Sequence, residues 1–432
     1  MNYMTADEAM RLVKSGDSIY VQGSTSIPLV LEEALARRGH ELEGVTIYSA
    51  FNVGRGEAPF CKPEFKEAFL TNSLFLCADQ RKWVAEGYGT MTPAFLGEIP
   101  FLFRSRQLPL DIAFINCSLP DENGYCSYGM SADLAVSAVE CSKIIIAEIN
   151  ESMPYLCGGA LIHESQITAA VRCDDPPVAL EFGPPTPIEQ AIGGYIAAEI
   201  PDGATLQIGV GGIPNAVLNG IKNHKHLGLH TEAMTDGVVR LIEEGVIDNS
   251  LKKIKPGKSV ASLALGSQHM YDFLNHNRDV EFYDVAWTND PQIIRQNPRV
   301  IAINSAIEVD ITGQVCADSI GTTIFSSVGG QHDFMYGGAL SEGGKTFIAL
   351  PSRTGKGKSK IVPTLTPGAG VVTTRFQTQY VATEHGIVYL RNKNLAQRAK
   401  ALITIAHPDD REALERAACE RFGYSFLRLK ND

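Results

Sequence analysis

The sequence predicts an α/β protein made of two related domains, each built on an open and mostly parallel sheet. Three observations support this fold class. Short apolar segments alternate with helix-like segments along nearly the whole chain, and those apolar segments suit strands buried on both faces. Two stretches far apart in the chain also share one order of features. At 432 residues the chain is too long for one average domain.

The elements follow this alternation from the start of the chain. Thr5 and Glu8 form a capping box for a first helix, residues 15–23 (SGDSIYVQG) predict a turn and a buried strand, and residues 30–39 (VLEEALARRG) predict a helix. The later strand candidates are GVTIYSA, SLFLCA, DIAFIN, KIIIAEI, ATLQIGV, SVASLAL, VIAINSA, TFIAL and YVATE. The later helix candidates are SADLAVSAVECS, PIEQAIGGYIAAEI, NLAQRAKALITIA and DDREALERAACERF.

A proline-rich segment divides the chain. Residues 174–190 (DDPPVALEFGPPTPIEQ) hold five prolines, which favour a stiff, extended connection. We therefore expect an N-terminal domain over 1–183 and a C-terminal domain over 184–432. Residues 15–35 and 201–221 both run turn, apolar strand, Gly-rich loop, Ile-Pro and helix, which suggests duplicated halves.

Composition limits the partners and the compartment. The net charge of −11 and the pI near 5.5 argue against binding to nucleic acid or to an anionic membrane surface. The nine cysteines form no C-x-x-C pair, and an odd number argues against a closed disulfide framework. Neither a leader sequence nor an apolar run of about 18 residues is found. We expect a soluble cytoplasmic protein.

Two glycine loops are candidates for binding a ligand through the backbone. Residues 209–214 (GVGGIP) follow a strand and open a helix, so their amides can point at an anion or an oxyanion. Pro214 stands where a dinucleotide fingerprint needs glycine. Gly329 and Gly330 in SSVGGQHDF also follow an apolar segment. For each loop the alternative is a tight turn without a ligand.

A third loop is basic in an otherwise acidic protein. Residues 353–360 (RTGKGKSK) carry Arg353, Lys356, Lys358 and Lys360 around glycines. Such a loop can hold phosphates through charge-assisted hydrogen bonds. The alternative is a solvated, mobile loop, which is the usual state of a run of like charges.

Glu232 lies in LHTEAMTDG (229–237), between a strand-like lead-in and the helix-like run DGVVRLIEEGV. The carboxylate is either a helix cap or a reactive group. As a cap it is a poor choice, because Thr235 and Asp236 are nearby and are better N-cap residues. As a nucleophile it is ionised at neutral pH, given a reference pKa of about 4.3, and a thioester is a suitable electrophile because its thiol leaves with a pKa of about 8.5.

Other chemistries find little support. His230, His332 and His385 lack the spacing of a metal set, and we expect no metal site. The chain contains neither a Walker lysine motif nor a G-x-S-x-G elbow.

Several motifs together resemble the acetyl-CoA hydrolase/transferase family, in particular its 4-hydroxybutyrate (butyrate/acetate) CoA-transferase branch. They are QIGVGGIPNAVL, HTEAMTDGVV, CADSIG, SVGGQHDF, IVPTLTPGAGVVTTR, TEHGIVYLRNKN and ITIAHPDDRE, and the resemblance runs over nearly the whole chain. The resemblance implies a class I CoA-transferase: two open-sheet domains of the NagB/RpiA/CoA-transferase-like type with the active site between them.

The resemblance also implies a ping-pong reaction between acyl-CoA and small carboxylic acids. The glutamate of the family's H-T-E motif, here Glu232, forms first an acyl-glutamyl anhydride and then a glutamyl-CoA thioester. Coenzyme A is a substrate, and no cofactor is bound permanently. The residues implied to contact CoA are Gly209, Val210, Gly211, Gly212, Ile213, Gly329, Gly330 and, in the basic loop, Lys358.

The acid substrate is less constrained. The repeat places Gln22 to Pro28, with Gly23 and Ser24, against the acyl group. The chain departs from the branch's usual pattern at Ala233-Met234, at 334–337 (FMYG) and at 153–156 (MPYL). These changes allow a dicarboxylate such as succinate or itaconate besides butyrate, 4-hydroxybutyrate or acetate, and Gln22, Tyr48 and Asn52 are candidates to meet a second carboxylate.

Two other functions stay open at this point. Water in place of the acceptor acid would make the protein an acyl-CoA hydrolase that uses the same glutamate. A related open-sheet fold can also serve as a catalytically silent regulator. The resemblance implies a homo-oligomer, commonly a homodimer.

Overall fold

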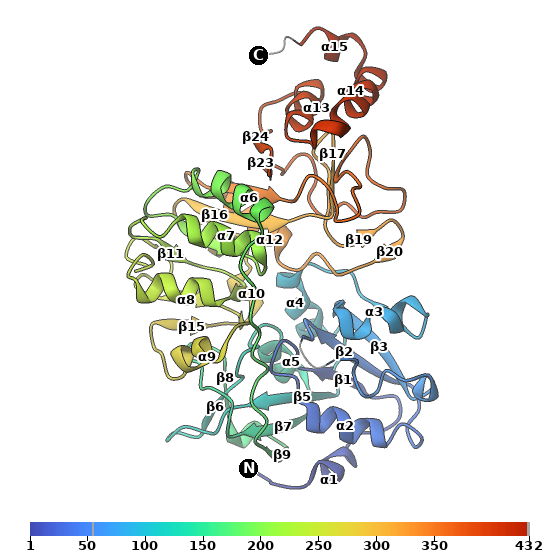
Figure 1. The fold of residues 1–432 in the computed structure, drawn as a ribbon. Coiled ribbons are helices and arrows are strands. Elements are labelled where there is room, and N and C mark those ends of the chain that lie inside the picture. Colours follow the sequence, from blue (N-terminus) through green and yellow to red (C-terminus); the bar gives the residue numbers. More distant parts are fainter. Residues whose placement is uncertain (54–55, 430–432) are drawn as a thin grey trace.

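The computed structural model describes residues 1–53 and 56–429, and it has two α/β domains that meet along a broad seam (Figure 1). The N-terminal domain holds a seven-stranded, fully parallel sheet in the order β4-β3-β2-β1-β5-β7-β9. In chain order the strands are β1 (Ser18–Val21), β2 (Val45–Ala50), β3 (Phe69–Phe75), β4 (Gly89–Met91), β5 (Ile112–Cys117), β7 (Ile144–Asn150) and β9 (Ala169–Cys173).

The C-terminal domain holds a six-stranded sheet in the order β11-β10-β16-β21-β23-β24. All pairs are parallel except β23 with the edge strand β24. The strands are β10 (Thr205–Ile208), β11 (Gly228–Leu229), β16 (Val300–Ser305), β21 (Lys345–Ala349), β23 (Tyr380–Thr383) and β24 (Gly386–Tyr389). Mixed α/β structure with open, mostly parallel sheets confirms the predicted fold class.

Helices cover both sheets. In the N-terminal domain they are α1 (Ala6–Met10), α2 (Leu29–Arg37), α3 (Ala78–Ala85), α4 (Ile99–Arg104) and α5 (Ala135–Cys141). In the C-terminal domain they are α6 (Pro187–Ala197), α7 (Gly212–Gly220), α8 (Asp236–Glu243), α9 (Gln268–Leu274), α10 (Val285–Thr288), α11 (Pro291–Ile294), α12 (Gln331–Leu340), α13 (Leu395–Thr404), α14 (Pro408–Phe422) and α15 (Tyr424–Leu427). Short 3-10 turns lie at Pro63–Phe65, Leu96–Glu98 and Glu164–Gln166.

Small two- and three-stranded sheets complete the fold. They are β6 (Tyr125–Ser127) with β8 (Leu161–His163), β12 (Ala233–Met234) with β14 (Leu263–Ala264), β13 (Ser259–Ala261) with β15 (Val280–Phe282), β17 (Glu308–Asp310) with β18 (Val315–Cys316) and β22 (Ile361–Val362), and β19 (Ser319–Ile320) with β20 (Thr323–Ile324). The expected single strand SVASLAL is therefore two short strands, β13 and β14, outside the main sheet. The break lies at Ser262, whose amide turns to the carbonyl of Glu232.

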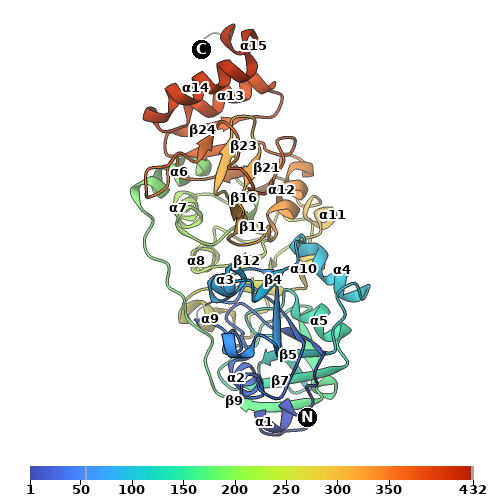
Figure 2. The same cartoon turned by 90° about the vertical axis from the view of Figure 1, so that its right-hand side faces the viewer.

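The proline-rich segment runs as an extended connection. Residues 174–186, between β9 and α6, contain neither helix nor strand. Figure 2 shows the chain passing along the side of the molecule from β9 up to α6. The exact division at residue 183 stays a prediction.

Strand order reverses once in each main sheet. In the N-terminal sheet the reversal lies between β1 and β5, and in the C-terminal sheet between β10 and β16. The carboxyl ends of strands at such a switch point are the usual ligand sites of open α/β sheets. Residues 22–28 follow β1 and residues 209–214 follow β10, so the two halves of the internal repeat occupy equivalent positions.

The seam between the domains is continuous with their cores. One buried apolar cluster contains residues of both domains, among them Tyr20, Ile115, Ile208 and Phe282. Backbone hydrogen bonds also cross the seam, from Ala132 N–H to Ser262 O at 3.0 Å and from Ala264 N–H to Met130 O at 2.9 Å. The two domains therefore share one core.

Candidate active site

Glu232 lies at the seam, just beyond the carboxyl end of β11. The preceding Thr231 fixes it to the neighbouring strand, because its hydroxyl donates to Ile208 O at 3.1 Å. The carbonyl of Glu232 accepts from Ser262 N–H at 2.9 Å and from Leu263 N–H at 3.0 Å. The N-cap of α8 is Thr235. Glu232 is therefore not a helix cap, and its carboxylate is free for another role.

Two groups contact the Glu232 carboxylate. Asn289 Nδ2 donates to its Oε2 at 3.0 Å. The backbone N–H of Gly330 is the second donor, and a Cβ at Gly330 would lie 2.0 Å from the same oxygen. Gly330 is also the N-cap of α12, so the positive end of that helix dipole faces the carboxylate. Only glycine fits at this position.

A second carboxylate lies beside the first. Asp333 is buried, accepts from Gly97 N–H at 3.0 Å and faces Asn289 Nδ2 at 3.4 Å. The pKa of Glu232 is raised to about 7, chiefly by burial; the Asn289 hydrogen bond opposes this shift and the charge of Asp333 adds to it. Burial likewise raises the pKa of Asp333 to about 7. The two acids compete for one amide.

His230 supports the site by holding the backbone next to Asn289. Its Nε2 lies 2.8 Å from Thr288 O, its ring stacks on Trp287, and burial lowers its pKa to about 3. The ring is therefore neutral and donates to the carbonyl next to Asn289. His230 is therefore assigned neither the role of a metal ligand nor that of a base. Its hydrogen bond with Thr288 O positions the turn that carries Asn289.

Sequence reasoning missed Asn289 and did not single out Asp333. Asp333 lies inside the quoted motif SVGGQHDF, three residues after Gly330. Asn289 follows the short helix α10 and has no local signal beyond a turn before Pro291. Only the fold brings it to Glu232.

The glycines of residues 209–213 have different surroundings. Gly211 has a φ of +127°, and a Cβ there would meet no atom within 4 Å, so a ligand can approach its backbone. A Cβ at Gly212 would lie 2.1 Å from the carboxylate of Glu189 on α6, so this glycine serves helix packing. Val210 is exposed and Ile213 is buried. Within this loop Gly211 is the position open to a ligand.

Gly329 faces the N-terminal domain. Its φ is +57°, its carbonyl accepts from Leu96 N–H at 3.1 Å, and the Phe75 ring lies 3.0 Å from the Cβ position. Phe75 stacks on Phe51 at 4.1 Å between ring centroids. Phe51 has a φ of +58°, which is strained for an aromatic residue. Phe51 also packs against the small apolar cluster of Ala233, Leu263 and Leu265, which includes the neighbour of Glu232.

The N-terminal residues proposed to meet the acyl group are mostly engaged within their own domain. Gln22 is fully buried, and its amide donates to Tyr128 O and Ser131 O at 2.7 Å each and accepts from Asn116 N–H at 2.7 Å. A Cβ at Gly23 would clash with Ala50 O. Gln22 and Gly23 therefore act as scaffold in this structure.

The other three N-terminal residues keep some polar capacity. Ser24 is buried with a φ of +57°, and its hydroxyl has no partner among the described residues. Tyr48 is buried, burial raises the pKa of its hydroxyl, and a hydrogen bond with the Asn72 side chain opposes that shift. Asn52 donates to Asp79 Oδ2 at 3.0 Å and lines a cavity of about 380 Å³ together with Val53, Asp79 and Arg81.

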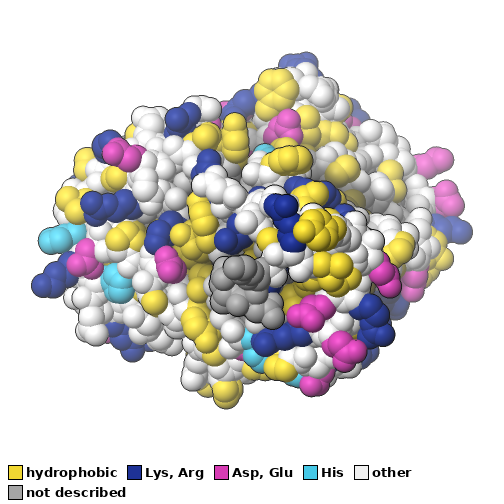
Figure 3. All heavy atoms as spheres, turned by 90° about the horizontal axis from the view of Figure 1, so that it is seen from above, with side chains coloured by type: hydrophobic (Ala, Val, Ile, Leu, Met, Phe, Trp, Pro, Cys, Tyr) yellow, Lys and Arg dark blue, Asp and Glu magenta, His cyan; other side chains and the backbone are white. Residues whose placement is uncertain are grey.

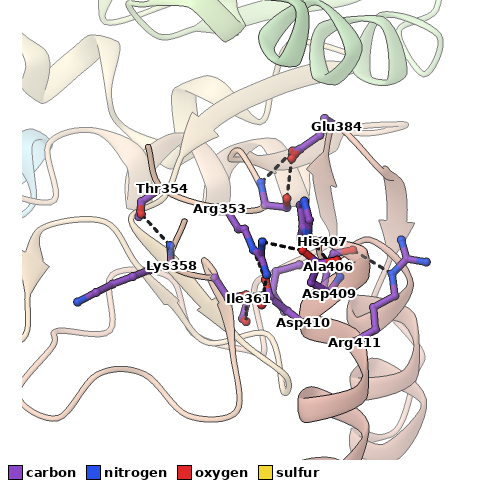
Figure 4. A network of polar contacts seen from close by, with 12 residues as sticks. Arg353, Thr354, Lys358, Ile361, Glu384, Ala406, His407, Asp409, Asp410 and Arg411 are labelled. Atoms are coloured by element: carbon purple, nitrogen blue, oxygen red, sulfur yellow. Dashed lines mark hydrogen bonds and ion pairs between the residues drawn. The ribbon is translucent and has the colours of Figure 1, made fainter. Parts of the chain in front are cut away.

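The basic loop follows β21 at the same edge of the sheet as Glu232. Lys358 is exposed, and its side chain extends away from the surrounding polar network (Figure 4). Arg353 is instead paired with Asp409 and Asp410. Lys358 and Lys356 form no ion pair within 1–53 and 56–429. Within the part of the chain that the structure describes, no hydrogen bond or ion pair joins this loop to Glu232.

The described residues contain neither a cluster of metal ligands nor a membrane-spanning helix. No group of three or more His, Cys, Asp or Glu side chains could hold a metal ion in that part of the chain. No helix among the same residues is long and apolar enough to cross a membrane. Seen from above, basic and acidic side chains are interspersed on the surface (Figure 3).

The fold and the site define a class of two-domain α/β proteins with open sheets and a buried glutamate beside a glycine loop in the seam between the domains. Family models agree. The acetyl-CoA hydrolase/transferase N-terminal domain matches residues 2–180, and the corresponding C-terminal domain matches residues 266–418. The chain belongs to the acetyl-CoA hydrolase/transferase family.

Individual relatives cover almost the whole chain. A succinyl-CoA:acetate/propanoyl-CoA:succinate CoA transferase of Fasciola hepatica is 45% identical over 96% of this chain and 87% of its own length. A 4-hydroxybutyrate coenzyme A transferase of Clostridium kluyveri is 42% identical over 97% of both chains. A crystal structure of 4-hydroxybutyrate CoA-transferase from Porphyromonas gingivalis has a TM-score of 0.84 and 38% identity over 98% of both chains.

Proposed function

We propose that this protein is a CoA-transferase that moves CoA between small carboxylic acids, with Glu232 as the nucleophile. The observation that carries the proposal is the Glu232 carboxylate itself, held beside Gly330 and Asn289 where the two domains meet. The names of relatives that are 35–45% identical support it, because all are CoA-transferases.

The reaction proceeds by two acyl exchanges at one side chain. The Glu232 carboxylate attacks the carbonyl carbon of the acyl-CoA, and the C–S bond breaks to give an acyl-glutamyl anhydride and CoA thiolate. The thiolate then attacks the glutamyl carbonyl and releases the first acid as its carboxylate, which leaves glutamyl-CoA thioester. An acceptor carboxylate reverses both steps and leaves as the new acyl-CoA.

The donors around Glu232 stabilise the charge that develops in these steps. The Gly330 N–H and the Asn289 amide already contact the carboxylate, and the open backbone at Gly211 is a further donor at the switch point between β10 and β16. Removal of one oxyanion donor typically lowers kcat by about a hundredfold or more. Two or three such donors account for a large part of the catalysis.

The same environment sets the protonation state of the nucleophile. With a pKa of about 7, Glu232 is only about half ionised at pH 7 in the free protein. Since the attacking form is the carboxylate, kcat/KM rises with pH through this value. A carboxylate that is desolvated and not fully paired is also a stronger nucleophile than one in water.

Binding of CoA is proposed along the carboxyl edge of the C-terminal sheet. Gly209 to Ile213, Gly329 and Gly330 lie at that edge, and the exposed Lys358 is available to the phosphates. The acyl group is proposed to extend past Phe51 toward the cavity of about 380 Å³ that Asn52 and Asp79 line. With Gln22 engaged, Asn52, Ser24 and Tyr48 remain the candidates for polar contacts with the acid.

A hydrolase is the main competitor. Relatives named acetyl-CoA hydrolases are more distant, one at 23% identity over 74% of this chain. Exclusion of water by Phe51, Phe75 and the seam favours transfer.

A cytoplasmic homodimer is proposed on the family resemblance. Light scattering coupled to size-exclusion chromatography measures the mass of the assembly.

The test is an exchange assay with purified protein. Butyryl-CoA or succinyl-CoA is incubated with and without acetate, and acetyl-CoA and free CoA are quantified. We expect acetyl-CoA to form only when acetate is present, and little free CoA to form with or without acetate. Glu232→Ala should form neither acetyl-CoA nor free CoA. CoA release that does not depend on acetate would make the protein a hydrolase, and full turnover by Glu232→Ala would refute the nucleophile.

A further inference from the structure

The basic loop (residues 353–360) is a closed and well-anchored turn. Thr354 N–H donates to Lys358 O at 2.8 Å, Gly357 N–H donates to Thr354 O at 2.8 Å, and Lys358 N–H donates to Thr354 Oγ1 at 3.1 Å. Arg353 pairs with Ser359 across the base of the turn. The tip, residues 355–358, is exposed.

Arg353 has most of its donors occupied within the protein. Its Nε donates to Asp410 Oδ2 at 2.7 Å and its Nη2 to Asp410 Oδ1 at 2.6 Å, so the pair is bidentate. Its Nη1 donates to Asp409 Oδ2 at 3.0 Å. Both acids lie in the first turn of α14, where the helix dipole favours negative charge. Figure 4 shows the guanidinium directed at α14, away from the tip of the loop.

A second contact fixes the other side of the base. The carboxylate of Glu384, which follows β23, accepts from Ser352 N–H at 2.8 Å and from Ser352 Oγ at 2.5 Å. Ser352 O in turn accepts from Lys360 N–H at 2.8 Å. Burial lowers the pKa of Lys360, which faces Glu384. Arg353 and Lys360 thus belong to the base, and Lys356 and Lys358 belong to the tip.

We infer that the pairing of Arg353 with Asp410 and Asp409 is a positioning device, which holds Lys356 and Lys358 where the phosphates of CoA bind. Arg353 is thus a positioning residue and not a phosphate ligand. The inference rests on the proposed function. It assigns to the start of α14 a role in recognising the nucleotide end of the substrate, exerted through Arg353.

The variants Asp410→Asn and Arg353→Lys test it. Both keep the size of the side chain and remove the bidentate ion pair. With butyryl-CoA, KM should rise by about tenfold in each variant, the loss expected for a displaced charge-assisted contact, while kcat stays within about twofold. With butyryl-pantetheine, which lacks the nucleotide and its phosphates, KM should not change. Glu412→Gln, an exposed position on the same helix, is the matched control.

The outcomes separate the competing explanations. Equal losses with butyryl-CoA and butyryl-pantetheine would mean a general structural defect and would overturn the inference. Tighter CoA binding in Asp410→Asn would show that the released Arg353 contacts phosphate itself, and unchanged CoA binding in Arg353→Lys would show that the bidentate pair does not position the loop; either result would overturn the inference. Calorimetry with CoA alone separates this inference from the proposed function. If the unmodified protein does not bind CoA, the proposed function is overturned. If it binds CoA and Asp410→Asn binds CoA equally well, only this inference is overturned.

Discussion

At the residue scale, the unusual feature of the site is that one amide serves two buried acids. Asn289 donates to Glu232 at 3.0 Å and to Asp333 at 3.4 Å through the same nitrogen. Its own carbonyl oxygen is buried without a partner among the described residues. Such an arrangement costs stability, and it is typical of a site in which a ligand completes the hydrogen bonds.

Asn289→Ala should slow the reaction and move its pH profile upward. The Asn289 hydrogen bond lowers the pKa of Glu232, so its loss raises that pKa further above 7 and leaves less carboxylate at neutral pH. We expect kcat/KM at pH 7 to fall by about 10- to 100-fold and the acid limb of the profile to shift to higher pH. Asn123→Ala, an exposed position, is the control. An unshifted limb would contradict this role.

Asp333→Asn should move the profile the other way. The charge of Asp333 raises the pKa of Glu232, so neutralising it lowers that pKa. The acid limb of kcat/KM should then shift to lower pH, while an amide oxygen at the same place can still accept from Gly97 N–H. The profile is measured beside that of Asn289→Ala, and shifts of the same sign in both variants would argue against the charge explanation.

Glu232 could be predicted from the sequence because its position does not suit a structural role. It lies just before a helix, where Thr235 is a better N-cap residue than a glutamate. Asn289 and Asp333 could not, since their importance depends on contacts across 57 and 101 residues of chain. Gln22 shows the opposite case. Its type and position suggested a ligand, and the structure places its amide among backbone groups of its own domain.

At the element scale, similar glycines perform different tasks. Gly212 leaves room for the Glu189 side chain, which belongs to the capping box of α6. Gly330 leaves room for the Glu232 carboxylate and Asn289, whose positions the chemistry requires. The sequence identified both loops, but which neighbour fills the space beside each glycine is decided by packing.

Gly330→Ala should abolish turnover without unfolding the protein. The new Cβ would lie 2.0 Å from Glu232 Oε2 and 2.5 Å from Asn289 Nδ2, so the carboxylate must leave its position. A displacement of this size should lower kcat by about a hundredfold or more. Gly194→Ala, at an exposed position on α6 where a Cβ meets no atom within 4 Å, is the matched control. Circular dichroism checks the fold, and retained activity in Gly330→Ala would contradict the site.

The strands were the most predictable elements, because parallel strands buried on both faces leave continuous apolar runs. The exception is SVASLAL, which is interrupted where Ser262 and Leu263 turn to Glu232 O. The basic loop was found from its composition. The engagement of Arg353 was not, because its partners on α14 lie 56 and 57 residues further along the chain.

At the scale of the whole molecule, several buried acids make the fold depend on pH. Burial raises the pKa of Glu232, Glu148 and Asp333 to about 7 and that of Asp133 to about 6. Each of these groups binds its proton more tightly in the folded state than in the unfolded state. The contribution of these four groups to the free energy of unfolding therefore falls as pH rises from about 4.5 to about 7.

Glu232→Gln should therefore stabilise the protein at pH 8 and not at pH 4. Above pH 7 the native carboxylate is charged and poorly solvated, so an uncharged amide should raise the free energy of unfolding by about 1–3 kcal/mol, whereas at pH 4 the native group is already neutral. Urea unfolding at the two pH values measures this, with Glu33→Gln on the surface of α2 as control. An equal gain at both pH values would contradict the titration argument.

The two-domain architecture and the switch-point loops followed from the sequence, because the internal repeat fixes equivalent positions after β1 and β10. The seam itself did not. Its apolar cluster and its backbone hydrogen bonds join segments far apart in the chain, such as Met130 with Ala264. No local sequence pattern predicts such pairs.

The central claim is that Glu232 becomes covalently attached to CoA, and trapping that adduct tests it most directly. The protein is mixed with butyryl-CoA or succinyl-CoA without an acceptor acid, and its intact mass and peptides are measured. We predict a CoA adduct on the peptide that holds Glu232, discharged by acetate and not formed by Glu232→Ala. Acetyl-CoA formation from acetate with no adduct on that peptide, or an adduct on another residue, would contradict the account.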